Sequence, residues 1–231
     1  MCEIYGFCGK YPSLLNDYTY VFWSHSEFHK DGFGYYLADK DDYFVSTLAA
    51  KDYHPLATTS FLTSLGLFHI RFKTHGEVSL TNCHPFIEKD NRGIQWALIH
   101  NGYVEDTPQM EVLRNFQTGE TDSERILLSL IETINHFYDY SSTDNEREER
   151  SFLYTILSHK LQEMSHLGKL NLIFTDNKTN NMYVFMNHAR TLHIQRAEDG
   201  VHIATTPLYG CGWEYIKPFQ LYIFNAGEQI R

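Results

Sequence analysis

The residue at position 2 is a cysteine that a single cleavage would turn into the amino terminus. The chain begins Met1-Cys2-Glu3, so removal of Met1 by an aminopeptidase would leave Cys2 with both a thiol and a free α-amino group. A cysteine thiol has a pKa of about 8.5 and reacts as the thiolate. An α-amino group, with a pKa of about 7.7–8.0, can accept that proton near neutral pH. One residue would then supply a nucleophile and its base, although a lone cysteine more often serves packing.

Arg71 and Asp122 are charged residues that each allow a structural and a functional interpretation. Alternation in the predicted strand 65–72 places His69 and Arg71 on one face. An arginine on a buried face is unfavourable unless an anion pairs with it, so Arg71 either faces solvent, pairs with an internal carboxylate or binds an anionic ligand. Asp122 lies in the sequence Thr121-Asp-Ser-Glu124, which is typical of a capping box. Its charge suits the start of a helix, so Asp122 needs no catalytic role.

Two further patterns suggest ligand sites that their context does not support. Four histidines (His69, His75, His84 and His100) fall within a short stretch, but none has the helical spacing of a zinc hydrolase. Gly32-Phe33-Gly34 precedes a predicted strand rather than opening a helix, which argues against a dinucleotide fingerprint. We therefore expect neither a metal site nor a cofactor. Asn101-Gly102 follows the apolar segment 96–100 and is typical of a hairpin turn.

Composition limits the classes of partner. The net charge of −10 argues against nucleic acid. No apolar run reaches the roughly 18–20 residues of a membrane span, and the chain starts without a signal-peptide pattern. The four cysteines (Cys2, Cys8, Cys83 and Cys211) show no CxxC spacing and are expected to be reduced thiols in a cytoplasmic protein.

The order of predicted elements is strands, then helices, then strands. With 42% hydrophobic residues, 16 Tyr and 16 Phe, the chain has enough apolar side chains for a β-rich core. This order favours one α+β domain over residues 1–231, with two antiparallel sheets packed together and helices outside. Strands are expected at 3–8, 35–37, 44–47, 65–72, 96–100, 170–174, 182–186, 192–195, 201–204 and 219–224, and helices within 13–28, 121–134 and 150–166.

Six motifs, taken together and in order, resemble the glutaminase domain of class II glutamine amidotransferases, which belong to the N-terminal-nucleophile hydrolase superfamily. They are Met-Cys-Glu-Ile-Tyr-Gly at 1–6, Asp-Gly-Phe-Gly at 31–34, His-Ile-Arg-Phe-Lys-Thr-His-Gly at 69–76, Asn-Cys-His-Pro-Phe at 82–86, His-Asn-Gly at 100–102 and Thr-Asp-Ser-Glu at 121–124. The resemblance implies a four-layer αββα sandwich.

The same resemblance implies roles for individual residues. Cys2 matches the nucleophile that attacks the glutamine amide, with its own α-amino group as the base. Asn101 and Gly102 match the oxyanion hole, where losing one donor costs roughly 10²–10³ in rate. The substrate-binding residues it implies are Arg71 for the α-carboxylate, Asp122 for the α-ammonium, Thr74 and His75 on the pocket loop, and His84 nearby.

Three departures from the family pattern concern the substrate tail. Phe72 stands where some members carry Trp, and Lys73 adds a charge beside the pocket loop. Thr205-Thr206-Pro207 occupies the place of a Ser-Glu-Pro-like turn. These differences leave the thiol chemistry intact.

Three functions are compatible with the resemblance. Larger members such as glucosamine-6-phosphate synthase follow this domain with one that consumes ammonia, and here we expect a single domain. The first function is hydrolysis of glutamine, or of a γ-glutamyl compound, through a thioester, with ammonia passed to a separate synthase subunit. The second is stand-alone hydrolysis of a larger γ-glutamyl substrate, and the third is non-catalytic glutamine binding, which intact Cys2, Asn101 and Gly102 argue against. Assembly into a homo-oligomer stays open.

Overall fold

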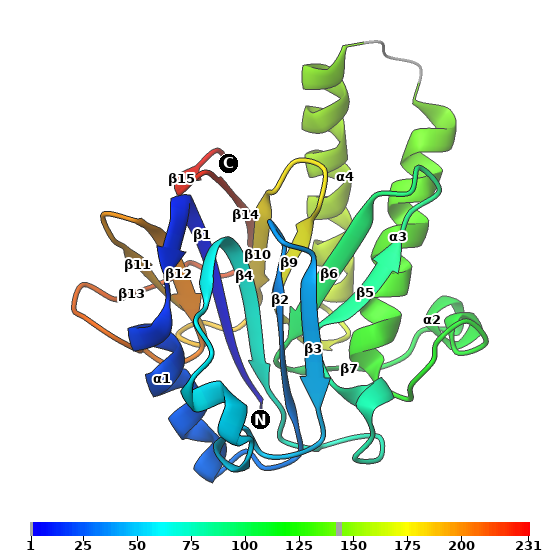
Figure 1. The fold of residues 1–231 in the computed structure, drawn as a ribbon. Helices are drawn as coiled ribbons and strands as arrows, with labels where there is room; N and C mark the ends of the chain where they lie inside the picture. The colour runs from blue at the N-terminus through cyan, green and yellow to red at the C-terminus, as the bar shows by residue number, and fades with distance from the viewer. Residues whose placement is uncertain (1, 142–144) are drawn as a thin grey trace.

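Two antiparallel sheets lie face to face, and helices cover their outer faces (Figure 1). The computed structural model describes residues 2–141 and 145–231. In the larger sheet the strand order is β13 (Glu214–Tyr215), β11 (His193–Arg196), β12 (Gly200–Ala204), β1 (Glu3–Leu14), β4 (Leu62–Ile70), β2 (Phe33–Leu37) and β3 (Asp42–Ser46). In the smaller sheet it is β15 (Glu228–Gln229), β14 (Gln220–Asn225), β10 (Met182–Met186), β9 (Asn171–Asp176), β6 (Gln95–His100) and β5 (Phe86–Lys89).

The helices form the two outer layers. Long helices α3 (Asp122–Tyr140) and α4 (Glu146–Met164) cover the smaller sheet, whereas α1 (Asn16–Ser24) and short 3₁₀ helices cover the larger one (Figure 1). The remaining elements are α2 (Pro108–Leu113), the 3₁₀ helices η1 (His25–Glu27), η2 (Ala50–Asp52), η3 (His54–Ala57) and η4 (Leu80–Asn82), and the pair β7 (Tyr103–Val104) and β8 (Gly168–Lys169). The expected αββα sandwich is therefore confirmed.

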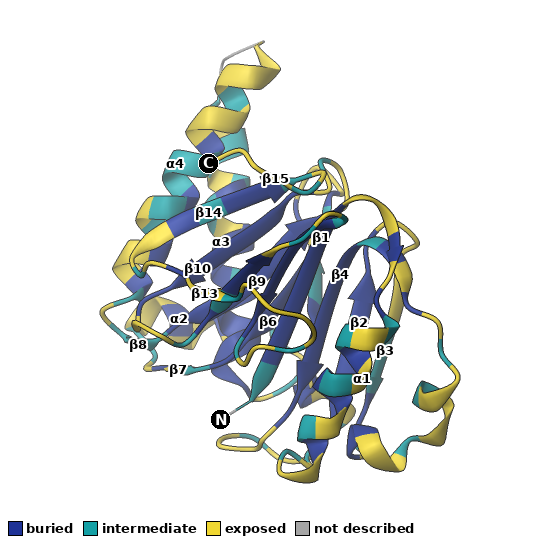
Figure 2. Ribbon diagram, turned by 90° about the vertical axis from the view of Figure 1, so that its left-hand side faces the viewer, coloured by how far each residue is buried: buried dark blue, intermediate teal, exposed yellow. Residues whose placement is uncertain are grey.

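Apolar side chains fill each of the three spaces between layers. Ile4, Leu67 and Ile173 belong to the core between the sheets, and Figure 2 shows that the central strands are buried. A second core joins the smaller sheet to α3 and α4, and a third, rich in aromatic rings, lies between the larger sheet and α1. Since both faces of the central strands are covered, alternation alone could not indicate which face was inside.

The observed elements correct several expected boundaries. Strand β4 ends at Ile70, so Arg71 lies just beyond the strand, and α4 begins at Glu146 rather than at 150. The segment 139–151, expected to be a solvated loop or the start of a helix, includes the end of α3 and the start of α4, and its residues 142–144 lie outside the described residues. Asn101-Gly102 is not a hairpin turn, because β6 pairs with β5 and β9 while β7 pairs with β8.

The start of α3 confirms only half of the predicted capping box. The Thr121 side chain accepts a hydrogen bond from the Glu124 N–H at 3.4 Å. The Glu124 carboxylate, however, accepts from the N–H groups of Thr118 at 2.6 Å and Gly119 at 2.8 Å, rather than from Thr121 itself. The carboxylate thus fixes the loop that leads into the helix.

Four chain segments meet at one end of the sandwich. They are the start of β1, the ends of β4 and β6, and the first turn of α3, which Figure 1 shows near the amino terminus. All four cysteines are free thiols, as expected. Among the described residues, no helix is long and apolar enough to span a membrane.

Candidate active site

Cys2 lies beside the residues that follow β4. Because Glu3 pairs with Ile70 across the β1–β4 ladder, the preceding residue, Cys2, falls next to Arg71 and Phe72. The Cys2 thiol lies 3.5 Å from the Phe72 carbonyl oxygen, and its Sγ accepts a hydrogen bond from the Phe72 N–H at 3.4 Å. The sulfur is therefore held by the backbone of the loop that carries the candidate pocket residues.

The environment of Cys2 does not stabilise a thiolate by itself. Burial of the thiol raises its pKa, and the negative charge of Asp122 acts in the same direction. The positive charge of Arg71 and the Phe72 backbone hydrogen bond lower the pKa of Cys2 but do not cancel the effect of burial. A reaction at this sulfur therefore needs a base that removes its proton.

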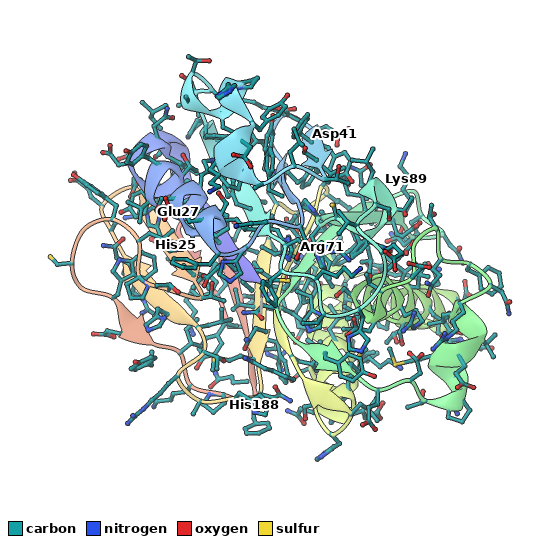
Figure 3. All side chains as sticks on the ribbon, turned by 90° about the horizontal axis from the view of Figure 1, so that it is seen from below. His25, Glu27, Asp41, Arg71, Lys89 and His188 are labelled. Atoms are coloured by element: carbon teal, nitrogen blue, oxygen red, sulfur yellow. The ribbon has the colours of Figure 1, made fainter. Side chains whose placement is uncertain are left out.

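Arg71 is a buried cation whose hydrogen bonding is incomplete. Only 3% of the residue is exposed, which rules out the solvent-face interpretation. Its Nη2 donates to the carbonyl oxygens of His75 at 3.0 Å and Gly76 at 3.5 Å, whereas its buried Nη1 has no partner among the described residues. Figure 3 looks at this end of the molecule from below and shows Arg71 near its middle.

The Asp31-Gly-Phe-Gly34 motif fixes the backbone around Arg71. The Arg71 N–H donates to the Gly32 carbonyl at 2.8 Å, and the Asp31 N–H donates to the Arg71 carbonyl at 3.2 Å. The Asp31 carboxylate accepts from the Lys73 N–H at 2.7 Å. Gly32 has a φ of 125°, and a Cβ there would approach the Cys83 sulfur to 2.7 Å. The motif is thus a structural support for Arg71.

Asn82 ties the loop after Arg71 to the segment before α3. Its Nδ2 donates to the Glu77 carbonyl at 2.9 Å and to the Glu120 carboxylate at 3.2 Å, and its Oδ1 accepts from the Glu120 N–H at 2.7 Å. The Glu120 carboxylate also accepts from the Glu77 N–H at 2.9 Å. These bonds fix the distance between the loop that carries Arg71 and the helix that carries Asp122.

The loop residues Thr74 and His75 are exposed. The His75 ring stacks on Tyr103, with centroids 4.4 Å apart. Both loop residues are therefore accessible beside Arg71.

Asp122 lies at the start of α3, close to the end of β6. Its Oδ2 accepts from the Val104 N–H at 2.9 Å and lies 4.0 Å from His100 Nδ1. The His100 Nε2 lies 3.0 Å from the Lys169 carbonyl and must donate to it, so Nδ1 accepts from the Ser123 hydroxyl at 2.9 Å. Burial lowers the pKa of His100, and with a neutral ring there the Asp122 carboxylate has no salt bridge to any of the described residues.

Asn101 and Gly102 leave β6 directly after His100. The Asn101 N–H donates to the Asn171 carbonyl at 2.9 Å, and the buried Asn101 Oδ1 has no partner among the described residues. A Cβ at Gly102 would overlap the Lys169 carbonyl oxygen, so only glycine fits here. Asn101 and Gly102 therefore place a side-chain amide and a backbone N–H at the same end of the sandwich as Cys2.

His69 and His84 form a buried pair of tilted rings near Arg71. Their ring centroids are 4.0 Å apart, and neither ring nitrogen of His84 has a partner among the described residues. Burial lowers the pKa of His69 to about 3, and both burial and the His69 charge lower that of His84. Both rings are therefore neutral at physiological pH and add no positive charge near Arg71, whose own charge also lowers both pKa values.

Buried polar atoms that lack partners gather around this site. Most buried polar groups in proteins are hydrogen-bonded, yet at this end several in the described part of the chain are not: His69, Arg71, His84, Asn101 and Asn171. The sequence indicated Arg71, His84 and Asn101 but not Asn171, whose only signal is its place at the start of a strand opposite Asn101. In the described part of the chain no group of three or more His, Cys, Asp or Glu could hold a metal ion. The arrangement therefore suits a small polar ligand carrying a carboxylate.

Comparisons with known proteins identify the family of the chain. Residues 1–198 match the family model for class-II glutamine amidotransferases. The chain is 26% identical to the putative glutamine amidotransferase YafJ of Escherichia coli, covering 87% of this chain and 88% of that protein. It is 25% identical to an uncharacterized protein of Methanocaldococcus jannaschii, covering all of this chain and 71% of the relative.

Solved structures show the same fold. A predicted glutamine amidotransferase from Pseudomonas aeruginosa superposes with a TM-score of 0.64 at 19% identity, over 100% of this chain and 95% of that one. Glutamine phosphoribosylpyrophosphate amidotransferase from B. subtilis superposes with a TM-score of 0.66 at 17% identity, over 97% of this chain and 47% of that one. The chain described here belongs to the class II glutamine amidotransferase family.

Proposed function

We propose that this protein hydrolyses the γ-amide of glutamine, or of a γ-glutamyl compound, with Cys2 as an amino-terminal nucleophile. The observation that carries the proposal is the buried guanidinium of Arg71, with Nη1 unpartnered, close enough to Cys2 to lower the pKa of its thiol. A buried cation is costly without an anion, and the α-carboxylate of a γ-glutamyl compound would supply one. Its α-ammonium group would bind the Asp122 carboxylate, in the first turn of α3.

The raised pKa of the Cys2 thiol supports a mechanism with a separate base. After removal of Met1, the Cys2 α-amino group takes the thiol proton, and the sulfur attacks the amide carbon. Asn101 Nδ2 and the Gly102 N–H stabilise the oxyanion, and such donors are worth roughly 10²–10³ in rate each. The C–N bond breaks as the α-ammonium protonates the leaving nitrogen, which departs as ammonia from glutamine or as an amine from a substituted γ-glutamyl amide. Water then attacks the thioester, releases glutamate and restores the thiol.

The remaining pocket residues would determine which substrate the pocket accepts. Thr74 and His75 are exposed on the loop after Arg71, and His84 lies beneath it against His69. We propose that the first two contact the bound γ-glutamyl group and that His84 supports the pocket floor. We propose that the ammonia passes to a separate acceptor. One human relative, which is named glutamine–fructose-6-phosphate aminotransferase 2, supports this proposal by its name. The match between the two covers 49% of this chain and 15% of that protein.

The test is glutamate release by protein whose Met1 has been removed, with glutamine and a series of γ-glutamyl amides as substrates, because hydrolysis of each of them yields glutamate. We expect hydrolysis of at least one, asparagine to release no aspartate, and a matched protein with a blocked amino terminus to be inactive. A clear preference for a larger γ-glutamyl amide over glutamine would favour the stand-alone hydrolase. Binding of glutamine without hydrolysis of any substrate would contradict the proposal and favour a non-catalytic subunit.

A further inference from the structure

Asn171 lies directly opposite Asn101 in the smaller sheet. His100 pairs with Leu172 in the antiparallel β6–β9 ladder, and the next pair outward joins Asn101 to Asn171 through a 2.9 Å backbone hydrogen bond. Side chains of directly opposed residues lie on the same face, with Cβ atoms roughly 4.5–5.5 Å apart. The two carboxamides are therefore neighbours.

Both carboxamides point toward the space between the sheets. Ile99 and Ile173, two residues further along each strand, pack in the core between the sheets. Because strand side chains alternate with a period of two, Asn101 and Asn171 extend the same face toward the end where Cys2 lies. Asn171 is 0% exposed, so water does not satisfy its polar atoms from the surface.

Each carboxamide also has a buried end that lacks a partner among the described residues. On Asn101 this is the acceptor Oδ1, and on Asn171 it is the donor Nδ2. The Thr191 hydroxyl lies 2.7 Å from Asn171 Oδ1 and also 2.7 Å from the His188 carbonyl. Whichever acceptor that hydroxyl serves, Asn171 Nδ2 has no hydrogen-bond partner in the described part of the chain, and it is not bonded to Asn101 Oδ1 in this structure.

We propose that Asn171 is a positioning residue that holds the Asn101 carboxamide in the orientation that stabilises the oxyanion. A bond from Asn171 Nδ2 to Asn101 Oδ1, made directly or through one water, would turn Asn101 Nδ2 toward the bound substrate. A free side-chain amide can rotate and present its oxygen instead, which would repel the oxyanion. This inference rests on the proposed function and adds to it a residue that does not touch the substrate.

The test compares Asn171→Leu with the wild-type protein and with Asn181→Leu as a matched control. Asn181 is also a buried asparagine, but it donates to Tyr154 at the opposite end of the sandwich. We expect Asn171→Leu to lower kcat roughly tenfold, part of the roughly 10²–10³ that a lost oxyanion donor costs, with KM within about twofold. Asn181→Leu should lower stability but not kcat. If Asn171→Leu does not fold, Asn171→Ala replaces it in the same comparison.

A double mutant separates positioning from a general structural effect. If Asn171 acts through Asn101, then Asn171→Leu should not lower kcat further in an Asn101→Ala background. An unchanged kcat in the single mutant, or an equal loss in both backgrounds, would overturn the inference. In contrast, a wild-type protein that hydrolyses no γ-glutamyl substrate, or an Asn101→Ala variant of full activity, would overturn the proposed function and this inference with it.

Discussion

Two clusters of buried polar side chains lie at opposite ends of the sandwich and differ in how their hydrogen bonds are satisfied. At the far end of β9, Asp176 accepts from the Tyr183 hydroxyl at 3.0 Å and from the Lys178 N–H at 3.0 Å. Asn181 donates to Tyr154 at 2.9 Å and accepts from Asn225 at 2.9 Å. At the near end, Arg71, Asn101 and others have buried atoms without partners among the described residues.

The difference separates polar groups that hold the fold from polar groups that await a ligand. A satisfied buried network stabilises the native state, whereas an unsatisfied donor is unfavourable by about 1–3 kcal/mol. Such a group is tolerated where the surrounding structure fixes it and where a ligand can pair with it. Mutations at the two ends should therefore affect different quantities: stability at the Asp176 end and catalysis at the Cys2 end.

The largest effect should come from Cys2. Cys2→Ala should lower kcat by about 10⁴-fold or more, because removal of a nucleophile leaves only residual catalysis. Glutamine should still raise the melting temperature of this variant, since Arg71 and Asp122 remain. Cys8→Ala, at a buried thiol of β1, the strand that follows Cys2, is the matched control and should keep full activity. Turnover by Cys2→Ala at the wild-type rate would be incompatible with the mechanism.

Arg71 should have the next largest effect, and it should appear mainly in KM. A hydrogen bond to a charged group contributes about 1.5–3 kcal/mol, so Arg71→Ala should raise KM roughly 10–150-fold and change kcat less. The control is Arg92→Ala, which removes an arginine that lies away from the site and forms a 3.1 Å salt bridge with Glu149. This substitution should change neither KM nor kcat. An unchanged KM for Arg71→Ala would make Arg71 a structural residue.

At the opposite end, the effect should be on stability alone. Tyr183→Phe removes the hydroxyl that donates to Asp176 and accepts from Asn181. The free energy of unfolding should fall by about 1–3 kcal/mol, measured by denaturant titration, while kcat/KM stays within about twofold of wild type. A loss of kcat/KM larger than that would show that the two clusters are not independent.

The smallest effect concerns the pH dependence of stability. The pKa of His69 is about 3 in the folded protein against 6.5 for an ordinary histidine. Between these values the unfolded chain binds the extra proton, so stability decreases as pH falls from about 6.5 toward 3. One such group contributes at most about 1.4 kcal/mol per pH unit. Denaturant titrations at pH 5 and 6 should show that the free energy of unfolding changes less with pH in His69→Phe than in the wild-type protein. An equal change with pH in both proteins would contradict the lowered pKa of His69.

The chemistry-bearing residues could be predicted from the sequence because they lie in short local motifs. Cys2, Arg71, Asn101 and Asp122 each belong to such a motif, and the order of strands and helices was enough to predict the layers. The structure brings these four to one end of the sandwich; their roles stay predictions.

The supporting contacts could not be predicted because their partners lie far apart in the chain. Asn82 reaches Glu120 and Asn101 meets Asn171 only once the sheets and α3 have packed. The Asn101-Gly102 pair is also a sequence typical of a hairpin turn. It therefore predicts a local hairpin instead of the long-range pairing of β6 with β9.

The most direct test of the central claim is mass spectrometry of protein labelled with a glutamine-like electrophile. Intact mass should show Met1 absent and one label per chain, and peptide mapping should place that label on Cys2. Excess glutamine, or the preferred γ-glutamyl substrate, should prevent labelling. Cys8, Cys83 and Cys211 should stay unmodified, because only Cys2 would carry the free α-amino group that takes the thiol proton. An active protein that retains Met1, or a label on any other cysteine, would contradict the account.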